Sequence, residues 1–146
     1  MALIRRTETQ IRFVSREQAD VHRELVPHEP LKHDELFGTT LYTLISAGTE
    51  LSGYTQERSA PAFPGYAAVF RVEAAGDQVT RFRPGEYAFC MGPHRSFQRV
   101  RQTEAVPIPE GLPLEQSVIA RLMAVSMTTL VTTAARPGQL VLVTGF

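Results

Sequence analysis

Residues 36–50 read LFGTTLYTLISAGTE, and this stretch contains the clearest strand pattern in the chain. Its first ten residues are rich in β-branched and aromatic side chains, a composition that favours a β-strand. The small residues that follow, Ser46–Glu50, predict a turn that can open a short helix, because Ser46 or Thr49 can cap exposed backbone N–H groups. The sequence therefore predicts a strand over residues 36–45 that ends in a turn at residues 46–50.

Shorter segments of the same kind lie on both sides of this strand. Loose alternation over residues 1–14 predicts an early strand or hairpin. The polar stretch 15–35, with Pro27 and Pro30, predicts an irregular crossing or a hairpin with a mobile loop. Several short strands separated by Pro and Gly turns are typical of a small barrel or sandwich. The further strands are expected at 66–74, 87–91 and 97–100, with a sheet edge at 105–109.

The sequence changes character after Gly111. Residues 114–135 contain no glycine or proline, and their apolar residues recur near helical spacing, which predicts one or two helices. Residues 139–146 are an apolar run into Gly145, typical of a buried parallel strand. Such a strand needs partners that the other residues do not provide, so we expect residues 139–146 to begin a truncated second domain.

Composition narrows the class of partner. The 146 residues carry 15 basic and 15 acidic side chains, so no field of one sign favours nucleic acid or an anionic membrane. No apolar stretch reaches the roughly 20 residues of a spanning helix, and the first residues lack a signal-peptide core, so we expect a cytoplasmic protein. The single cysteine, Cys90, cannot form an internal disulfide or by itself build a thiolate zinc site.

The order of these segments resembles the medium-chain dehydrogenase/reductase superfamily, which includes the zinc-type alcohol dehydrogenases. Ser46–Glu50 looks like the family's Cys-Gly-Thr/Ser-Asp turn, and Pro64–Ala67 begins a stretch that is similar to its Gly-His-Glu signature. Arg136–Gly145 looks like the family's entry to the nucleotide-binding domain. Ser46–Glu50 and Phe89–His94 together look closest to the zinc-ligand-free branch that holds the bacteriochlorophyllide dehydrogenases.

This resemblance implies a fold and an activity. Residues 1–138 would form a GroES-like catalytic domain, a mainly β, partly open barrel with C-terminal helices, and residues 139–146 would be the first strand of a Rossmann domain. The implied activity is NAD(P)-dependent hydride transfer to or from a carbonyl, an alcohol or an activated alkene. NAD or NADP would bind mostly outside these residues, which alone should be inactive. The implied partners are a small-molecule substrate and a second copy, joined through the missing domain.

At the positions that match the family's zinc ligands, this sequence has no Cys or His side chain. The first Cys falls on Ala47, the His on Tyr66, the neighbouring Glu on Ala67, and the second Cys on or near Ala124. A methyl group cannot coordinate a cation, so we expect no zinc. Hydrogen bonds would have to polarise the substrate oxygen instead.

The resemblance assigns catalysis to Thr49 and Tyr66. Thr49 matches the hydroxyl that relays the proton in zinc members, and Tyr66 puts a phenol where the His ligand stood. From the residues alone, a helix cap for Thr49 and a packed aromatic side chain for Tyr66 remain open. Glu50 and His94 are expected in the substrate cleft, with a solvent-facing turn acid and a hydrogen-bonded turn histidine as the alternatives.

The same resemblance implies which residues would contact the nicotinamide cofactor. The residues expected there are Thr128, Thr129 and Gly145. Threonines within a helix often bond back to the preceding turn, and this alternative stays open for the first two. Cys90, between Phe89 and Met91, is expected to be a small buried hydrophobe and not a nucleophile.

Two rival interpretations stay open. One is a GroES-like barrel that has lost redox chemistry and serves as a binding or assembly module. The other is a zinc enzyme whose site is rearranged around His28, His33 or His94.

Overall fold

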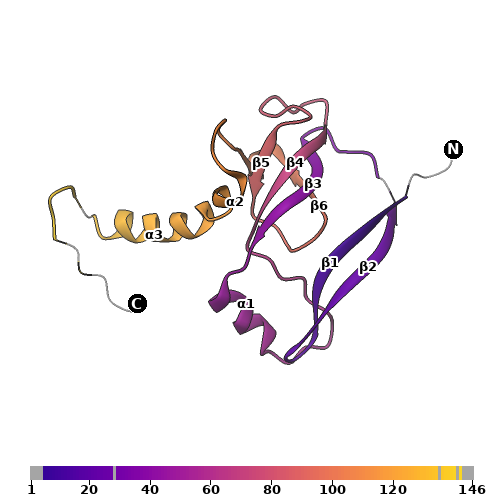
Figure 1. The fold of residues 1–146 in the computed structure, drawn as a ribbon, viewed down its shortest axis with the longest axis horizontal. Coiled ribbons are helices and arrows are strands. Elements are labelled where there is room, and N and C mark those ends of the chain that lie inside the picture. Colours follow the sequence, from indigo (N-terminus) through magenta and orange to yellow (C-terminus); the bar gives the residue numbers. More distant parts are fainter. Residues whose placement is uncertain (1–4, 28, 135, 141, 143–146) are drawn as a thin grey trace.

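Two antiparallel β-sheets form the body of the chain in the computed structural model, which describes residues 5–27, 29–134, 136–140 and 142 (Figure 1). The smaller sheet is a hairpin of β1 (Arg5–Ser15) and β2 (Gln18–Pro27). The larger sheet has five strands in the order β6-β3-β4-β5-β7. Its strands are β3 (Glu35–Leu44), β4 (Ala67–Ala75), β5 (Tyr87–Cys90), β6 (Phe97–Arg101) and β7 (Ala105–Pro107). The helices are α1 (Ala47–Tyr54), α2 (Leu114–Ser117) and α3 (Ala120–Thr132), with a 3-10 turn, η1 (Gln102–Glu104), before β7.

The central strand β4 is buried on both of its faces. Residues 67–70 have no exposed surface. Phe70 packs with Leu36 in the main core, whereas Val69 packs with Val118 in a smaller core on the opposite face. Successive strand side chains alternate between faces, so this short apolar run supplies both cores.

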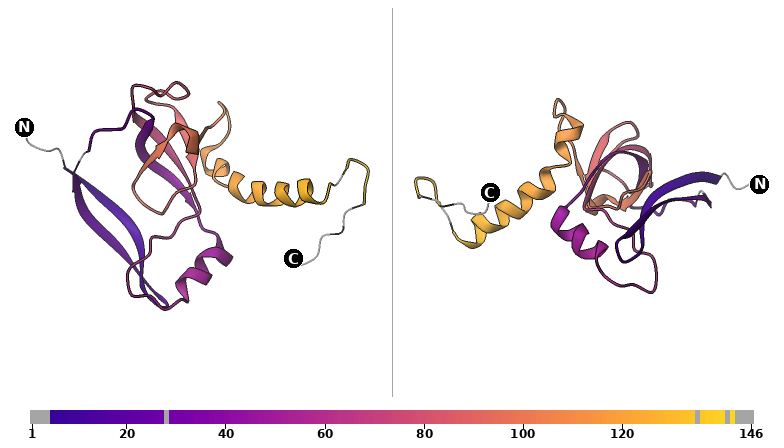
Figure 2. Two further views of the ribbon diagram at one scale, coloured as in Figure 1. Left: turned by 180° about the vertical axis from the view of Figure 1, so that it is seen from behind. Right: turned by 60° about the horizontal axis from the view of Figure 1, so that its bottom comes forward.

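The hairpin is joined to the larger sheet by the connection between β5 and β6. The Ile11 N–H donates to the His94 carbonyl at 2.9 Å, and the Ser96 N–H donates to the Thr9 carbonyl at 2.8 Å. On the other side of the connection, the Thr40 N–H donates to the Ser96 carbonyl at 2.9 Å. These bonds hold β1 beside β3, and the two sheets together make a mainly β, partly open barrel (Figures 1 and 2).

Most of the elements expected from the sequence are present. The strand expected at 36–45 is β3, the polar turn opens α1, and both α2 and α3 lie within 114–134. The edge strand expected at 105–109 is β7, at one end of the sheet order. Of the two alternatives for the polar stretch 15–35, the hairpin is correct, because β2 pairs with β1 along its whole length.

Helix α3 extends to one side of the sheet in every view (Figures 1 and 2). Its apolar side chains are exposed, and no α3 residue is buried within the described part of the chain, although the helical spacing of these residues suggests a buried face. Most of the strand expected over residues 139–146, Gly145 included, lies outside the described residues. The described Leu140 and Leu142 are exposed and lie in no strand. No described helix is long and apolar enough to cross a membrane.

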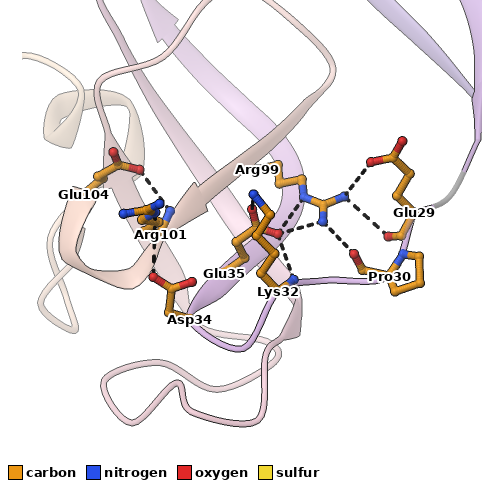
Figure 3. A network of polar contacts seen from close by, with 8 residues as sticks. All are labelled: Glu29, Pro30, Lys32, Asp34, Glu35, Arg99, Arg101 and Glu104. Carbon is orange, nitrogen blue, oxygen red and sulfur yellow. Dashed lines mark hydrogen bonds and ion pairs between the residues drawn. The ribbon is translucent and has the colours of Figure 1, made fainter.

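A polar cluster fixes the start of β3 to β6 (Figure 3). Arg99 donates to Glu35 Oε2 from Nε at 2.9 Å and from Nη2 at 2.6 Å, and its Nη2 also donates to the Pro30 carbonyl at 2.6 Å. The Lys32 backbone N–H donates to Glu35 Oε2 at 2.9 Å. Chiefly this backbone hydrogen bond, and then the Arg99 guanidinium, hold the pKa of Glu35 below its ordinary value.

The lowered pKa predicts that Glu35 contributes to acid unfolding. A carboxyl with a lowered folded-state pKa stabilises the fold above its unfolded pKa, here about 4.5, and this stabilisation is lost as the pH falls through the folded-state pKa. Glu35→Gln removes the titrating group, so the urea midpoint of the variant should fall less than that of the wild type between about pH 6 and pH 3. The urea midpoint of the variant should still depend partly on pH. A hydrogen bond from Thr39 also lowers the pKa of Glu73, and one from Arg12 lowers the pKa of Asp20.

Glu29→Gln is the matched control for this experiment. Glu29 contacts the same Arg99, but at 3.8 Å and with 72% of its side chain exposed. An exposed pair of this kind contributes little, so the control should keep the wild-type pH dependence. An equally steep fall in Glu35→Gln and in wild type would contradict the assignment.

Candidate active site

The side chain of His94 lies between a carboxylate and a hydroxyl. Its Nε2 is 3.0 Å from Glu50 Oε2, and its Nδ1 is 2.7 Å from Thr43 Oγ1. Only 10% of the His94 side chain and 13% of the Glu50 side chain are exposed. The structure thus brings together the two residues that were expected in the substrate cleft.

Backbone contacts fix the position of His94. Its N–H donates to the Pro64 carbonyl at 2.8 Å, while its own carbonyl accepts the bond from Ile11 in β1. Gly65 makes this approach possible, since a Cβ there would lie 2.3 Å from the Cα of Pro93, and its φ of +143° disfavours other residues. The Pro64-Gly65 pair therefore has a direct structural role beside the site.

Glu50 and Thr49 are held by the start of α1. The Ser46 N–H donates to Glu50 Oε1 at 3.0 Å, and the Ser46 hydroxyl donates to Thr49 Oγ1 at 3.2 Å. An acidic side chain in a first helical turn is also favoured by the helix dipole. Thr49 and Glu50 line a hollow of about 220 Å³ that reaches Gly65, so a ligand there could contact the Thr49 hydroxyl.

Tyr66 lies in a different environment. Its ring is covered by the guanidinium of Arg121, with the Arg121 Cζ atom 4.8 Å from the ring centroid, and it is not among the residues that line the hollow beside Thr49. This contact joins the start of β4 to α3 and is the kind of cation–π packing that fixes an aromatic ring.

The expected cofactor residues lie on α3 or outside the described chain. Thr128 and Thr129 are both exposed, and Thr128 Oγ1 donates to the Ala124 carbonyl at 2.9 Å. This is the bond to the preceding turn that threonines within helices often make. Gly145 is outside the described residues.

The sequence interpretation missed Thr43. It is an ordinary strand threonine in the sequence, and only the fold brings β3 to the ring nitrogen of His94 that Glu50 does not contact. No local motif signals such a contact, because the two residues are 51 positions apart.

The described residues contain no group of three or more His, Cys, Asp or Glu side chains that could hold a metal ion. His28 lies outside those residues, and the exposed His33 is paired with Asp77, 2.6 Å from Nδ1 to Oδ1. Both ring nitrogens of His94 already have partners. The positions that match zinc ligands carry side chains with no suitable donor set, so the residues present do not fit the catalytic zinc of the resembled family.

Solved structures of larger proteins share this fold. The chain matches an oxidoreductase/dehydrogenase of unknown specificity from Escherichia coli with a TM-score of 0.77 and 14% identity, over 92% of this chain and 49% of the other. It matches alcohol dehydrogenase TADH from Thermus sp. ATN1 with a TM-score of 0.76 and 16% identity, over 89% and 49% of the two chains. It matches a putative NADPH:quinone reductase from Bacillus thuringiensis with a TM-score of 0.70 and 21% identity, over 88% of this chain and 41% of the other.

These similarities, all below 25% sequence identity, show the fold of the chain. The chain spans about half the length of the structures it matches. No protein-family model matches the sequence, and no curated protein is similar to it. The mainly β, GroES-like partly open barrel expected from the sequence is confirmed as the fold of the chain.

Cys90 packs as expected and should be chemically inert. Its side chain belongs to the main core, and burial raises the pKa of its thiol to about 12. Because the thiolate is the reactive form, iodoacetamide at about pH 8 should modify the folded chain on the order of 10³-fold more slowly than the chain in guanidinium. Mass spectrometry of the single thiol measures both rates, and similar rates would contradict a buried thiol.

Proposed function

We propose that this chain is the catalytic-domain portion of a zinc-independent, NAD(P)-dependent oxidoreductase. Its proposed reaction is hydride transfer to or from a carbonyl, an alcohol or an activated alkene. The observation that supports this most is the likeness over about nine-tenths of the chain to structures described as dehydrogenases and reductases. Function resides in sites and not in folds, so the proposal also needs suitable chemistry at the site.

The site offers that chemistry through hydrogen-bond donors. The Thr49 hydroxyl borders the hollow beside Glu50. The Tyr66 phenol is the second donor that the resemblance implies, although its ring lies against Arg121 and not on that hollow. In the proposed reaction, such donors stabilise the negative charge that develops on the substrate oxygen. They replace the Lewis acid for which Ala47 and Ala124 provide no ligand.

The nicotinamide cofactor would supply or accept the hydride when bound. Two observations favour a cofactor site that this chain completes with a second domain. The chain covers about half of the matched structures, and the apolar side chains of α3, among them Met123, Val125 and Val131, are exposed within the described residues. Apolar surface of this extent is typical of an interface. Thr128 and Thr129 lie on this helix and are proposed to contact the nicotinamide.

Nicotinamide binding tests the proposal. We expect the full gene product that contains these residues to quench or enhance NADH or NADPH fluorescence saturably, and residues 1–146 alone to bind weakly or not at all. A folded gene product that binds neither nucleotide would contradict the proposal and favour a binding or assembly module. Zinc analysis of protein purified without chelator should show no stoichiometric metal, and one zinc per chain would overturn the zinc-independent mechanism.

Substitution of the two donors tests their roles. We expect Thr49→Val to lower kcat about 100-fold with little change in KM, because it removes a donor to the developing charge. The proposal assigns the same loss to Tyr66→Phe, although the Tyr66 ring lies against Arg121 and does not line the hollow beside Thr49. Thr55→Val is the matched control, since Thr55 caps the other end of α1 with a bond from its hydroxyl to the Leu51 carbonyl. The control should retain kcat, and full activity in Thr49→Val or Tyr66→Phe would remove that residue from the mechanism.

A further inference from the structure

Three side chains from separate parts of the chain form one hydrogen-bonded series. Thr43 lies near the end of β3, His94 lies between β5 and β6, and Glu50 lies in the first turn of α1. The distances from His94 are 2.7 Å to the Thr43 hydroxyl and 3.0 Å to the Glu50 carboxylate. In a series of this order, the imidazole can take the proton of the hydroxyl while the carboxylate orients the imidazole. The hydroxyl oxygen can then accept a proton from another molecule.

The acceptors in this series decide where its protons lie. An ionised carboxylate can only accept, so Nε2 of His94 must carry the proton that faces Glu50. In the neutral imidazole, Nδ1 then has a lone pair and accepts the hydroxyl proton of Thr43. The Thr43 oxygen keeps lone pairs with which it can accept a hydrogen bond from a bound molecule.

Thr43 and His94 border a groove that could hold such a molecule. The groove has a volume of about 260 Å³. It lies between β1, the second half of β3 and residues 94–96 of the β5–β6 connection. Thr9, Thr40 and Ser96 add hydroxyl-bearing side chains to its wall, and Leu41 and Tyr42 add apolar surface. Gln10 and Arg95 add an amide and a guanidinium, which can donate to a ligand oxygen. This mixture suits a small molecule with a hydroxyl or carbonyl group on a short apolar body.

We propose that Thr43, His94 and Glu50 form a proton relay for a small alcohol or carbonyl compound bound in this groove. The proton of a bound alcohol passes to Thr43 Oγ1 while the Thr43 proton passes to His94 Nδ1. The alcohol becomes an alkoxide and His94 becomes an imidazolium beside Glu50. The reverse transfers protonate an alkoxide, and no electrons move in either direction.

The groove and the hollow beside Thr49 have no lining residue in common, so the relay serves a second binding site and does not replace the Thr49 donor. Proton transfer at this second site needs neither a nicotinamide nor a hydride. Thr43 is the residue of the relay whose hydroxyl touches the ligand. Glu50 is a positioning residue that acts through the tautomer of His94.

The first test reads that tautomer in the 146-residue chain, without cofactor. Nitrogen-15 NMR of labelled histidine at about pH 8 should show the His94 proton on Nε2, with His94→Gln to assign the signal. Thr43→Val should leave the tautomer unchanged, whereas Glu50→Gln should produce a mixture, because a glutamine amide can donate as well as accept. A proton on Nδ1 in the wild type would overturn the relay.

The second test uses 2,2,2-trifluoroethanol as the alcohol probe. Millimolar probe should shift the His94 Nδ1 signal saturably, and Thr43→Val should weaken its binding roughly five-fold, the effect of losing one hydrogen bond. Thr43→Ser keeps a hydroxyl and should bind within about two-fold of wild type, and amide spectra check that each variant is folded. Methyl 2,2,2-trifluoroethyl ether, which has no O–H to donate, should bind more weakly than the alcohol.

These outcomes separate the relay from the proposed redox function. Absence of saturable binding, equal binding by Thr43→Val, or equal binding of the ether would overturn the relay even if the gene product binds nicotinamide. Failure to bind nicotinamide, with the Nε2 tautomer and Thr43-dependent probe binding intact, would overturn the redox function alone.

Discussion

Backbone hydrogen bonds on both sides of residues 93–96 hold the hairpin against the larger sheet. Ile11 and Thr9 of β1 bond to His94 and Ser96 on one side, and Thr40 of β3 bonds to Ser96 on the other. Each bond contributes only about 1 kcal/mol net, but leaving such groups buried without partners costs more. The same segment carries His94, so the interaction that closes the barrel also positions the imidazole between α1 and β3.

The surroundings of Glu50 explain how a site could persist without metal ligands. The resemblance puts Glu50 at a position where a carboxylate orients its neighbours, and the structure shows that its neighbour is His94. The phenol of Tyr66 is instead on the β4 side that faces α3, where Arg121 covers its ring. A charged side chain that is largely buried needs hydrogen-bond partners, and Ser46 and His94 supply one to each oxygen of Glu50.

Sequence patterns predicted the elements of this fold better than the contacts between them. β3 and β4 were recognisable because most of their side chains are apolar, β-branched or aromatic. β2 was ambiguous because its stability comes from backbone pairing with β1, while most of its side chains remain polar and exposed. Thr49 and Glu50 could be singled out because the turn that carries them resembles a family motif. Thr43 could not, because its partner is brought to it by long-range strand pairing. The exposure of α3 could not be predicted either. Helical spacing shows which face of a helix is apolar, but it does not show which other element covers that face.

A β-bulge decides which side of β3 the Thr43 hydroxyl occupies. Thr40 pairs with Phe70 and Thr43 pairs with Ala68, but Tyr42 pairs with Val69, so Leu41 is the extra residue. With regular alternation, Thr40 and Thr43 would lie on opposite faces of the strand. The bulge shifts the register by one residue and puts both on the face of Phe70 and Ala68, because a shift of one residue reverses every later side chain. Contact between Thr43 and His94 therefore depends on an irregularity of the strand that no alternating sequence pattern encodes.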